Sequence, residues 1–216
     1  MKISILIPTK NEPLINELIA KIHRVLTGYN HEIIIIDKSN VPPKIKGAKL
    51  ILQKSNGLGK AVIEGLQHVK GNGIIVMDGD FSHEPKYLPD FIEKLKEADI
   101  VIGSRYIVGG HTKDKFMRKI VSKVAIWNVK NFLGIGVEDP VSGFFAVRKK
   151  VFDFINLSPV GFKILVEILY KTKNKMFKVA EIPIIFNPRK KGESKFDFWE
   201  IKNFLNLLFS LRVGSK

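Results

Sequence analysis

Two aspartates that end an apolar run are the residues best suited to chemistry in this chain. Residues 74–77 read Ile-Ile-Val-Met, and Asp78, Gly79 and Asp80 follow directly. Ligands gather at the carboxyl ends of strands in parallel α/β sheets, and Mg²⁺ is typically bound by one or two carboxylates plus substrate phosphates. The run therefore predicts a metal–diphosphate site at a strand end, with an ordinary Asp-Gly-Asp turn as the structural alternative.

Polar residues follow three other apolar runs, where a sugar nucleotide would find partners. Because neighbouring strand ends border one cleft, we expect these groups to lie near the two aspartates. Taken singly, each also fits a helix cap or a tight turn, so their joint placement carries the prediction. The groups are Pro8, Thr9, Lys10, Asn11 and Glu12 after the first run, Asp37 after the second, and Asn56, Gly57, Gly59 and Lys60 after the third.

Basic residues later in the chain provide groups that bind phosphate. Arg105 follows an apolar run, and Arg118 and Ser122 are four residues apart, which places them on one face of a helix. A basic loop runs from Arg189 to Lys195. Arginine binds phosphate in a bidentate way and lysine acts as a point charge. A solvated surface position is the structural alternative for Arg118 and for the loop.

The scaffold that must position these residues follows from the alternation of apolar runs and helical patterns. Continuous apolar strands that alternate with helices predict an α/β protein with a mostly parallel sheet flanked by helices. The expected strands are 3–7, 32–37, 49–53, 73–77, 99–103, 143–147 and 178–185. The expected helices are 12–26, 58–69, 85–96, 116–133, 162–170 and 198–213. We expect one domain over 1–196 and an amphipathic C-terminal helix over 197–216.

Composition limits the classes of function. The chain has 216 residues, a formal net charge of +15 and no cysteine, which excludes a disulfide, a zinc–thiolate site and a cysteine nucleophile. The charge favours nucleic acid, phosphorylated substrates or an anionic membrane surface. A nucleic-acid partner would rest on charge alone, and without a zinc-finger or RNA-binding signature we expect none. The apolar run of residues 3–8 is too short for a signal peptide, and we expect no membrane-spanning helix.

Several longer motifs make the chain resemble a known family. They are Ile-Pro-Thr-Lys-Asn-Glu from Ile7, Asn-Gly-Leu-Gly-Lys-Ala from Asn56, Met-Asp-Gly-Asp-Phe-Ser-His-Glu-Pro from Met77, Gly-Ser-Arg-Tyr from Gly103, Asp-Pro-Val-Ser-Gly-Phe from Asp139, and Glu-Ile-Pro-Ile with Gly-Glu-Ser-Lys from Glu181. With these motifs the chain resembles glycosyltransferase family 2, and within it the dolichyl-phosphate mannose synthases and related polyprenyl-phosphate glycosyltransferases. The resemblance covers residues 3 to about 196.

The resemblance implies a GT-A fold, in which a Rossmann-like nucleotide half and an acceptor half share one sheet. It implies that Pro8, Thr9, Glu12 and Asp37 lie near the nucleoside. It assigns Asp78, Gly79 and Asp80 to ribose, diphosphate and metal, with Ser82 nearby as a further metal ligand. It assigns the acceptor phosphate to Arg105, Arg118 and Ser122, and closure over the substrates to Arg189 and Lys195. Lys38 stands where many relatives have a second acidic residue, which leaves the nucleotide base open.

The reaction implied is an inverting transfer of a hexose from a nucleoside diphosphate to a polyprenyl phosphate. Mg²⁺ or Mn²⁺ on Asp78 and Asp80 would offset the charge of the leaving diphosphate. The acceptor phosphate is already ionised near neutral pH and needs no general base, so we interpret His83 as structural. Asp139 corresponds to a catalytic base in relatives with hydroxyl acceptors, and here it either orients its neighbours or contacts the sugar.

The C-terminal helix suits a lipid substrate. Its apolar residues cover much of its circumference and polar residues interrupt them, which is typical of a helix that lies in a membrane interface. Packing on the sheet or on a second subunit is the alternative, so oligomerisation stays open. We expect a protein peripheral at the cytoplasmic face of a membrane. Its partners would be a nucleotide-sugar donor, a polyprenyl phosphate and the membrane surface.

Three functional hypotheses remain at this point. The first is a mannosyltransferase that uses GDP-mannose and dolichyl or another polyprenyl phosphate. The second is a glucosyltransferase that uses UDP-glucose and the same kind of lipid. The third is a nucleotide-sugar-binding protein without turnover, against which the presence of Asp78, Asp80, Arg105 and Lys195 argues.

Overall fold

The β-branched apolar runs of the first half form the centre of a seven-stranded sheet. The computed structural model describes residues 1–158, 161, 163–188 and 198–213. The four consecutive isoleucines at residues 33–36 are all buried. Two of them contact the core on one side of the sheet and two contact the core on the other. A strand that is apolar at every position is thus explained by a sheet that is covered on both faces.

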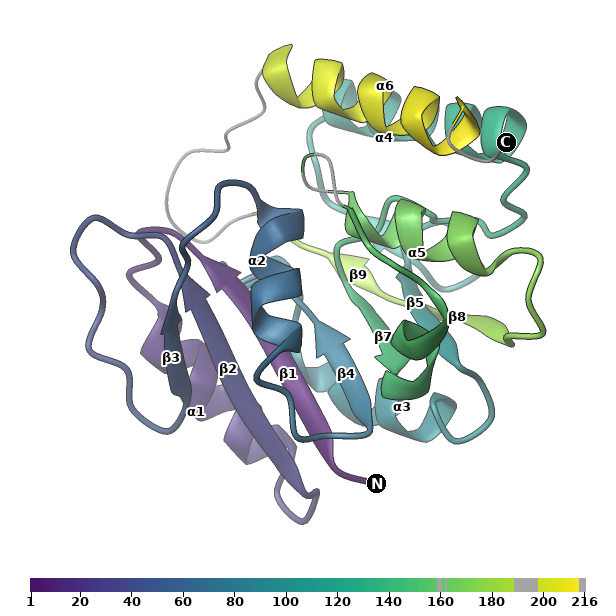
Figure 1. The fold of residues 1–216 in the computed structure, drawn as a ribbon. Coiled ribbons are helices and arrows are strands. Elements are labelled where there is room, and N and C mark those ends of the chain that lie inside the picture. The colour runs from purple at the N-terminus through teal and green to yellow at the C-terminus, as the bar shows by residue number, and fades with distance from the viewer. Residues whose placement is uncertain (159–160, 162, 189–197, 214–216) are drawn as a thin grey trace.

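The elements appear in the alternating order that the sequence predicts (Figure 1). The strands are β1 (Ile3–Thr9), β2 (His31–Asp37), β3 (Lys49–Leu52), β4 (Gly73–Val76), β5 (Ile100–Ser104), β6 (His111–Thr112), β7 (Phe145–Arg148), β8 (Val179–Pro183) and β9 (Ile185–Phe186). The α-helices are α1 (Ile15–Val25), α2 (Leu58–Leu66), α3 (Leu88–Lys94), α4 (Phe116–Leu133), α5 (Ile164–Thr172) and α6 (Phe198–Val213). Two 3₁₀ helices are η1 (Pro85–Tyr87) and η2 (Lys149–Phe154).

The large sheet has the strand order β3-β2-β1-β4-β7-β5-β8. All its strands run in the same direction except β7, which pairs antiparallel with both β4 and β5. The expected mostly parallel sheet flanked by helices is confirmed. The carboxyl ends of β1, β2, β4, β5 and β8 therefore lie at one edge, and the segment that enters β7 starts at the same edge.

The single strand expected over 178–185 is in fact two strands. β8 ends at Pro183 and pairs with β5, whereas β9 pairs with β6 in a separate two-stranded sheet. Proline has no N–H to continue a ladder. After it, the Ile184 N–H donates to the Ser104 carbonyl and its own carbonyl accepts from the His111 N–H. This switch brings β9 and the following Asn187 to the site edge.

Two apolar layers cover the faces of the sheet. α1 and α3 pack on one face with the odd-numbered isoleucines of β1. α2, α4, α5 and α6 contribute to the layer on the other face, where Leu207, Leu208 and Leu211 of α6 are buried. α6 lies beside α4 (Figure 1), and the Phe132 and Phe209 rings meet edge to face at 5.6 Å between centroids. Within the described residues, no helix has both the length and the apolar character that crossing a membrane requires.

Candidate functional site

The nucleoside side of the site is organised by Asp37 at the end of β2. Its Oδ1 accepts from the Thr9 hydroxyl at 2.9 Å and from the Ser39 hydroxyl at 2.8 Å, and its Oδ2 accepts from the Ser39 N–H at 2.9 Å. The Asn11 N–H donates to Ser39 Oγ at 2.7 Å, with Asn11 in a left-handed conformation at φ 56°. These bonds fix the loops after β1 and β2 to each other. Pro8, next to Thr9, pairs with Ile36 inside the sheet.

Gly79 is required by close packing between the loops after β1 and β4. A Cβ at Gly79 would lie 2.9 Å from Thr9 Cγ2 and 3.6 Å from Glu12 Cγ. A methyl group cannot approach another carbon that closely without displacing backbone or side chains. The glycine therefore lets the Asp78–Asp80 segment lie directly against the β1 loop, as the sequence pattern predicts.

Asp80 is held in place by Ser82. The Asp80 side chain is buried, at 6% residue exposure, and its Oδ1 accepts from the Ser82 N–H at 2.9 Å and from the Ser82 hydroxyl at 2.5 Å. The intervening Phe81 has a left-handed backbone with φ 64°. Ser82 thus orients the Asp80 carboxylate, and its expected role as a further metal ligand stays a prediction.

His83 accepts a hydrogen bond from the backbone of Asp78 and fixes its position. The Asp78 N–H donates to His83 Nδ1 at 3.0 Å, which requires the imidazole tautomer with its proton on Nε2. The ring stacks on Phe144 and meets Phe186 edge to face. Burial lowers the pKa of His83 in spite of the nearby aspartates. A neutral, fully packed histidine agrees with the structural interpretation made from the sequence.

Gly143 lies close to both the Asp78 carboxylate and the His83 ring. A Cβ at Gly143 would lie 3.2 Å from His83 Cε1 and 3.7 Å from Asp78 Oδ2. The Asp139–Phe144 motif therefore borders Asp78 directly. Its neighbouring Ser142 hydroxyl donates to the Gly103 carbonyl at 2.7 Å, which fixes the motif to the end of β5.

Arg105 and Asp139 form a buried ion pair next to this motif. Arg105 Nε and Nη2 donate to Asp139 Oδ2 and Oδ1 at 2.7 and 2.9 Å, and the Arg105 N–H donates to Oδ2 at 3.1 Å. Nη2 also donates to the Ser122 hydroxyl of α4 at 3.1 Å. Burial lowers the pKa of Arg105, but the bonds to Asp139 outweigh burial and raise it. Asp139 orients a neighbour, which was one of its two expected roles.

Glu181 of β8 belongs to the Glu-Ile-Pro-Ile motif and was not predicted as a site residue. Its Oε2 and Oε1 accept from the backbone N–H groups of Glu138 and Asp139 at 2.7 and 3.0 Å. Lys163 donates to the Val141 carbonyl at 2.8 Å in the same loop. The acidic residue in the Glu-Ile-Pro-Ile motif was the only feature of the sequence that could have indicated a role for Glu181. Its partners are backbone N–H groups, which a sequence pattern does not reveal.

Arg118 is the exposed cation among the three residues predicted to bind the acceptor phosphate, which are Arg105, Arg118 and Ser122. It lies near the start of α4, its side chain is 42% exposed, and its Nη1 is 3.7 Å from Asp114 Oδ1. Ser122 is one turn further along α4 and contacts Arg105. The structure therefore connects Ser122 and Arg105 directly and places Arg118 on the adjoining turn of the same helix.

The predicted Asn56–Gly57 segment lies at the start of α2. Both residues are exposed, and Gly57 adopts φ +96° immediately before the first helical residue. Gln53 Nε2 donates to the Gly57 carbonyl at 2.9 Å, and the Gly59 N–H donates to the Gly161 carbonyl at 3.1 Å. The glycine-rich loop thus joins β3 to the segment before α5. Arg189 and Lys195 lie outside the described residues.

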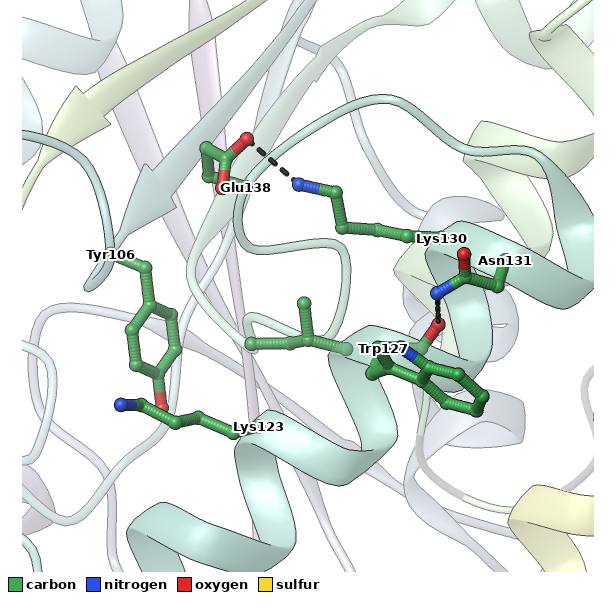
Figure 2. Close-up of a pocket in the computed structure, with 7 residues that line it drawn as sticks. Tyr106, Lys123, Trp127, Lys130, Asn131 and Glu138 are labelled. Carbon is green, nitrogen blue, oxygen red and sulfur yellow. Dashed lines mark hydrogen bonds and ion pairs between the residues drawn. The ribbon is translucent and has the colours of Figure 1, made fainter.

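A pocket of about 490 Å³ adjoins the Arg105–Asp139 pair on the side of α4. Figure 2 shows the residues that line this pocket. Tyr106 directly follows Arg105 and Glu138 directly precedes Asp139, while Trp127 lies on α4. Lys130 Nζ of α4 lies 2.8 Å from Glu138 Oε1, and Asn131 Nδ2 donates to the Trp127 carbonyl at 2.8 Å. The pocket combines an apolar wall with two lysines, Lys123 and Lys130.

The arrangement as a whole has two ends with different chemistry. Carboxylates and backbone groups at the ends of β1, β2 and β4 can hold ribose, a divalent cation and diphosphate. Cations on α4 and the end of β5 can face an anionic second substrate. Among the described residues, no three His, Cys, Asp or Glu side chains cluster as a preformed metal cage. The donor set is instead a carboxylate pair, which suits a cation shared with phosphates.

The sequence of the chain is similar to those of known glycosyltransferases. The model of the family described as Glycosyl transferase family 2 matches residues 4–155. The dolichol-phosphate mannosyltransferase of Pyrococcus furiosus is 40% identical over 98% of this chain, and that of Saccharomyces cerevisiae is 33% identical over 76% of it. The chain spans 64% of the length of each of these two relatives.

Solved structures share the fold at low sequence identity. Glucosyl-3-phosphoglycerate synthase from Mycobacterium tuberculosis, in complex with Mn²⁺, UDP and phosphoglyceric acid, superposes with a TM-score of 0.72 at 17% identity. The match covers 99% of this chain and 78% of that one. The same enzyme with Mg²⁺ and UDP gives a TM-score of 0.73. The expected GT-A fold is thereby confirmed.

Proposed function

The chain belongs to glycosyl transferase family 2, and from that premise we propose that it transfers mannose from GDP-mannose to dolichyl or another polyprenyl phosphate. The observation that carries the proposal is the joint placement of the Asp78–Asp80 segment and the Arg105–Asp139–Ser122 group at one sheet edge, linked by Gly143. The names of the Pyrococcus and yeast relatives support a mannosyl donor and a dolichyl phosphate acceptor.

Asp78 and Asp80 are proposed to hold Mg²⁺ or Mn²⁺ together with the donor diphosphate. The fit rests on a hard-oxygen donor set at a strand end, on the Ser82 bonds that orient Asp80, and on the glycine at 143 that leaves room beside Asp78. The cation would supply electrostatic stabilisation of the leaving diphosphate. Mn²⁺ and Mg²⁺ in the solved Mycobacterium tuberculosis enzyme support this proposal.

Different residues are proposed to hold the two substrates of an inverting transfer. The loop bonds of Thr9, Asn11 and Asp37 hold the nucleoside side rigid, and Pro8, Glu12, Asn56 and Gly57 border it.

On the acceptor side, Arg118 and Ser122 are proposed to face the acceptor phosphate, with the Arg105 guanidinium behind them. They offset the charge of this phosphate as it approaches a diphosphate. The acceptor oxygen attacks the anomeric carbon, the bond to the diphosphate oxygen breaks, and no protein base removes a proton because the phosphate is already ionised. Arg189 and Lys195 stay proposed as groups that close over the substrates.

A membrane-facing surface on α4 and α6 would bring a lipid acceptor to this site. Five large apolar side chains of α4 are exposed, and basic residues separate them. The exposed apolar residues are Phe116, Met117, Ile120, Val124 and Trp127, joined by Leu205, Phe209 and Val213 of α6. Apolar groups set among lysines suit an anionic lipid interface. We place the protein at the cytoplasmic face, where the leaflet carries negative charge.

A donor comparison tests the proposed function. Purified protein in detergent, with polyprenyl phosphate and Mg²⁺ or Mn²⁺, is given radiolabelled GDP-mannose or UDP-glucose, and label in the lipid fraction is counted. We expect label from GDP-mannose and an anomerically inverted product. Label only from UDP-glucose would assign the enzyme to glucosyl transfer. Metal-dependent nucleotide binding without transfer from either donor would contradict the polyprenyl phosphate as acceptor.

A further inference from the structure

We infer that Glu181 is a positioning residue that aligns the acceptor side of the site through the backbone of the Glu138–Asp139 turn. This inference rests on the proposed function for its kinetic consequences and on the geometry for its physical basis. Glu181 lies on β8, one strand away from β7, and contacts neither Arg105 nor α4 in any bond seen among the described residues. Its effect on the site would therefore be indirect.

The carboxylate of Glu181 holds two consecutive backbone N–H groups at once. Oε2 accepts from Glu138 at 2.7 Å and Oε1 accepts from Asp139 at 3.0 Å. Hydrogen bonds to an ionised acceptor are shorter and stronger than those between neutral groups. With one oxygen assigned to each N–H, both the position and the rotation of this turn are fixed relative to β8.

Both side chains of the clamped turn reach toward α4. Asp139 contacts Arg105 through three bonds, and Arg105 Nη2 continues to Ser122. Glu138 pairs with Lys130 at 2.8 Å across the pocket beside the site, as Figure 2 shows. Through these contacts the turn holds α4 at Ser122 and at Lys130, about two helical turns apart, and Glu181 fixes the backbone of the turn.

The buried charges make this alignment sensitive. Asp139 has no exposed surface and the Arg105 side chain is 11% exposed. Because water does not reach these charges, a small displacement of either group weakens their attraction and no solvation replaces it. A shift of the turn would alter the direction of the Arg105 guanidinium, which holds Ser122 beside Arg118 on the proposed acceptor side. At metal sites, removal of a group that orients a metal ligand typically costs about 10- to 100-fold in affinity or activity, and we expect an effect of that order for Glu181.

The substitution Glu181→Gln keeps the size of the side chain and removes half of its acceptor capacity. The amide NH₂ cannot accept from a backbone N–H, so either Glu138 or Asp139 loses its partner. We expect the KM for polyprenyl phosphate to rise about tenfold, with a lower kcat, while the KM for the nucleotide sugar stays within about twofold. Glu97→Gln removes the same charge from an exposed residue in the turn after α3 and serves as the control.

A spectroscopic measurement tests the positioning role independently of activity. The Arg105 Nε–H signal in NMR spectra is expected at low field and in slow exchange because it donates to buried Asp139. In Glu181→Gln it should move upfield and exchange faster, and in Glu97→Gln it should not change. An unchanged Arg105 signal, or equal changes in both KM values, would overturn the inference. Wild-type protein that transfers no sugar would instead refute the proposed function, and the Arg105 signal would still decide the role of Glu181.

Discussion

At the scale of single residues, the proposed acceptor side contains an arginine whose charge is already compensated by Asp139. Arg105 directs Nε and Nη2 to Asp139 and Ser122 within a nearly solvent-free environment. A buried pair of this kind contributes more to the geometry of a site than to its net charge. The exposed Arg118 is then the group better placed to add attraction for an anionic acceptor.

Removal of Arg105 should destabilise the fold as well as the site. In Arg105→Ala, the Asp139 carboxylate stays buried without its cation, which typically costs about 3–5 kcal/mol. The free energy of unfolding in urea measures this loss. Arg24→Ala, on the exposed face of α1, should change it by about 0.5 kcal/mol or less. Equal values for the two variants would contradict the buried ion pair.

Asp99 predicts a pH dependence of stability away from the site. Burial raises the pKa of Asp99, but the bonds from the Lys150 ammonium at 2.7 Å and the Lys178 N–H at 3.1 Å outweigh burial and lower it. Because the pKa is lower in the folded state, the contribution is fully present above the unfolded pKa of about 4 and is lost as pH falls through the folded pKa.

The substitution Asp99→Asn should therefore cost about 1–2 kcal/mol at pH 7. The difference from wild type should shrink as the pH is lowered from about 5 to about 2. Urea unfolding across this range measures it, with the exposed Asp153→Asn as the matched control. A cost that is constant with pH would show that the Asp99 interactions do not depend on its charge.

At the scale of elements, the sequence predicts the strands well and their arrangement less completely. Every strand of the large sheet was expected, because apolar runs mark buried strands regardless of direction. The antiparallel direction of β7 was not predictable from its pattern, since a strand buried on both faces reads the same either way. The division of β8 from β9 depends on the pairing of β9 with β6, a two-residue strand with no periodicity.

The candidate site divides in the same way. Residues at strand ends, such as Asp37, Asp78 and Asp80, were predictable because strand direction alone places them together. Their supporting partners, Ser39 and Glu181, act through local turns and backbone N–H groups. Such contacts depend on loop conformation, which the pattern of residue types does not specify.

Gly79 provides a prediction at the element scale, because it sets the distance between the loops after β1 and β4. In Gly79→Ala, the new methyl would meet Thr9 Cγ2, and Thr9 is held by its bond to Asp37. We expect weaker nucleotide-sugar binding and a loss of about 1–3 kcal/mol in stability. Calorimetric titration and urea unfolding measure the two effects. Gly136→Ala meets no atom within 4 Å and should change neither.

At the scale of the whole molecule, the charge of +15 and the exposed α4 face favour one orientation on a lipid surface. Both α4 and α6 lie along the same side of the molecule (Figure 1), and α4 carries Arg118 and Ser122 of the proposed acceptor end. A lipid phosphate would then reach Arg118 and Ser122 with its chain still in the membrane.

A single change on α4 tests this orientation. Met117→Glu replaces an apolar side chain, 67% exposed, with a charge that anionic lipid repels. We expect binding to vesicles that contain anionic lipid to fall about tenfold in a sedimentation assay, since a buried methionine contributes about 1.5–3 kcal/mol. Val41→Glu, at an exposed position after β2, is the control. Equal loss in both variants would assign the effect to net charge alone.

The most direct test of the account is mannose transfer by wild-type protein and two aspartate variants. Radiolabelled GDP-mannose, dolichyl phosphate and Mn²⁺ are supplied to wild type, Asp80→Asn and Asp90→Asn, where Asp90 is exposed on α3. We predict transfer by wild type and Asp90→Asn, and a loss of about a hundredfold or more in Asp80→Asn because the leaving diphosphate loses its stabilisation. Transfer at the wild-type rate by Asp80→Asn would contradict the claim that the end of β4 is the catalytic centre.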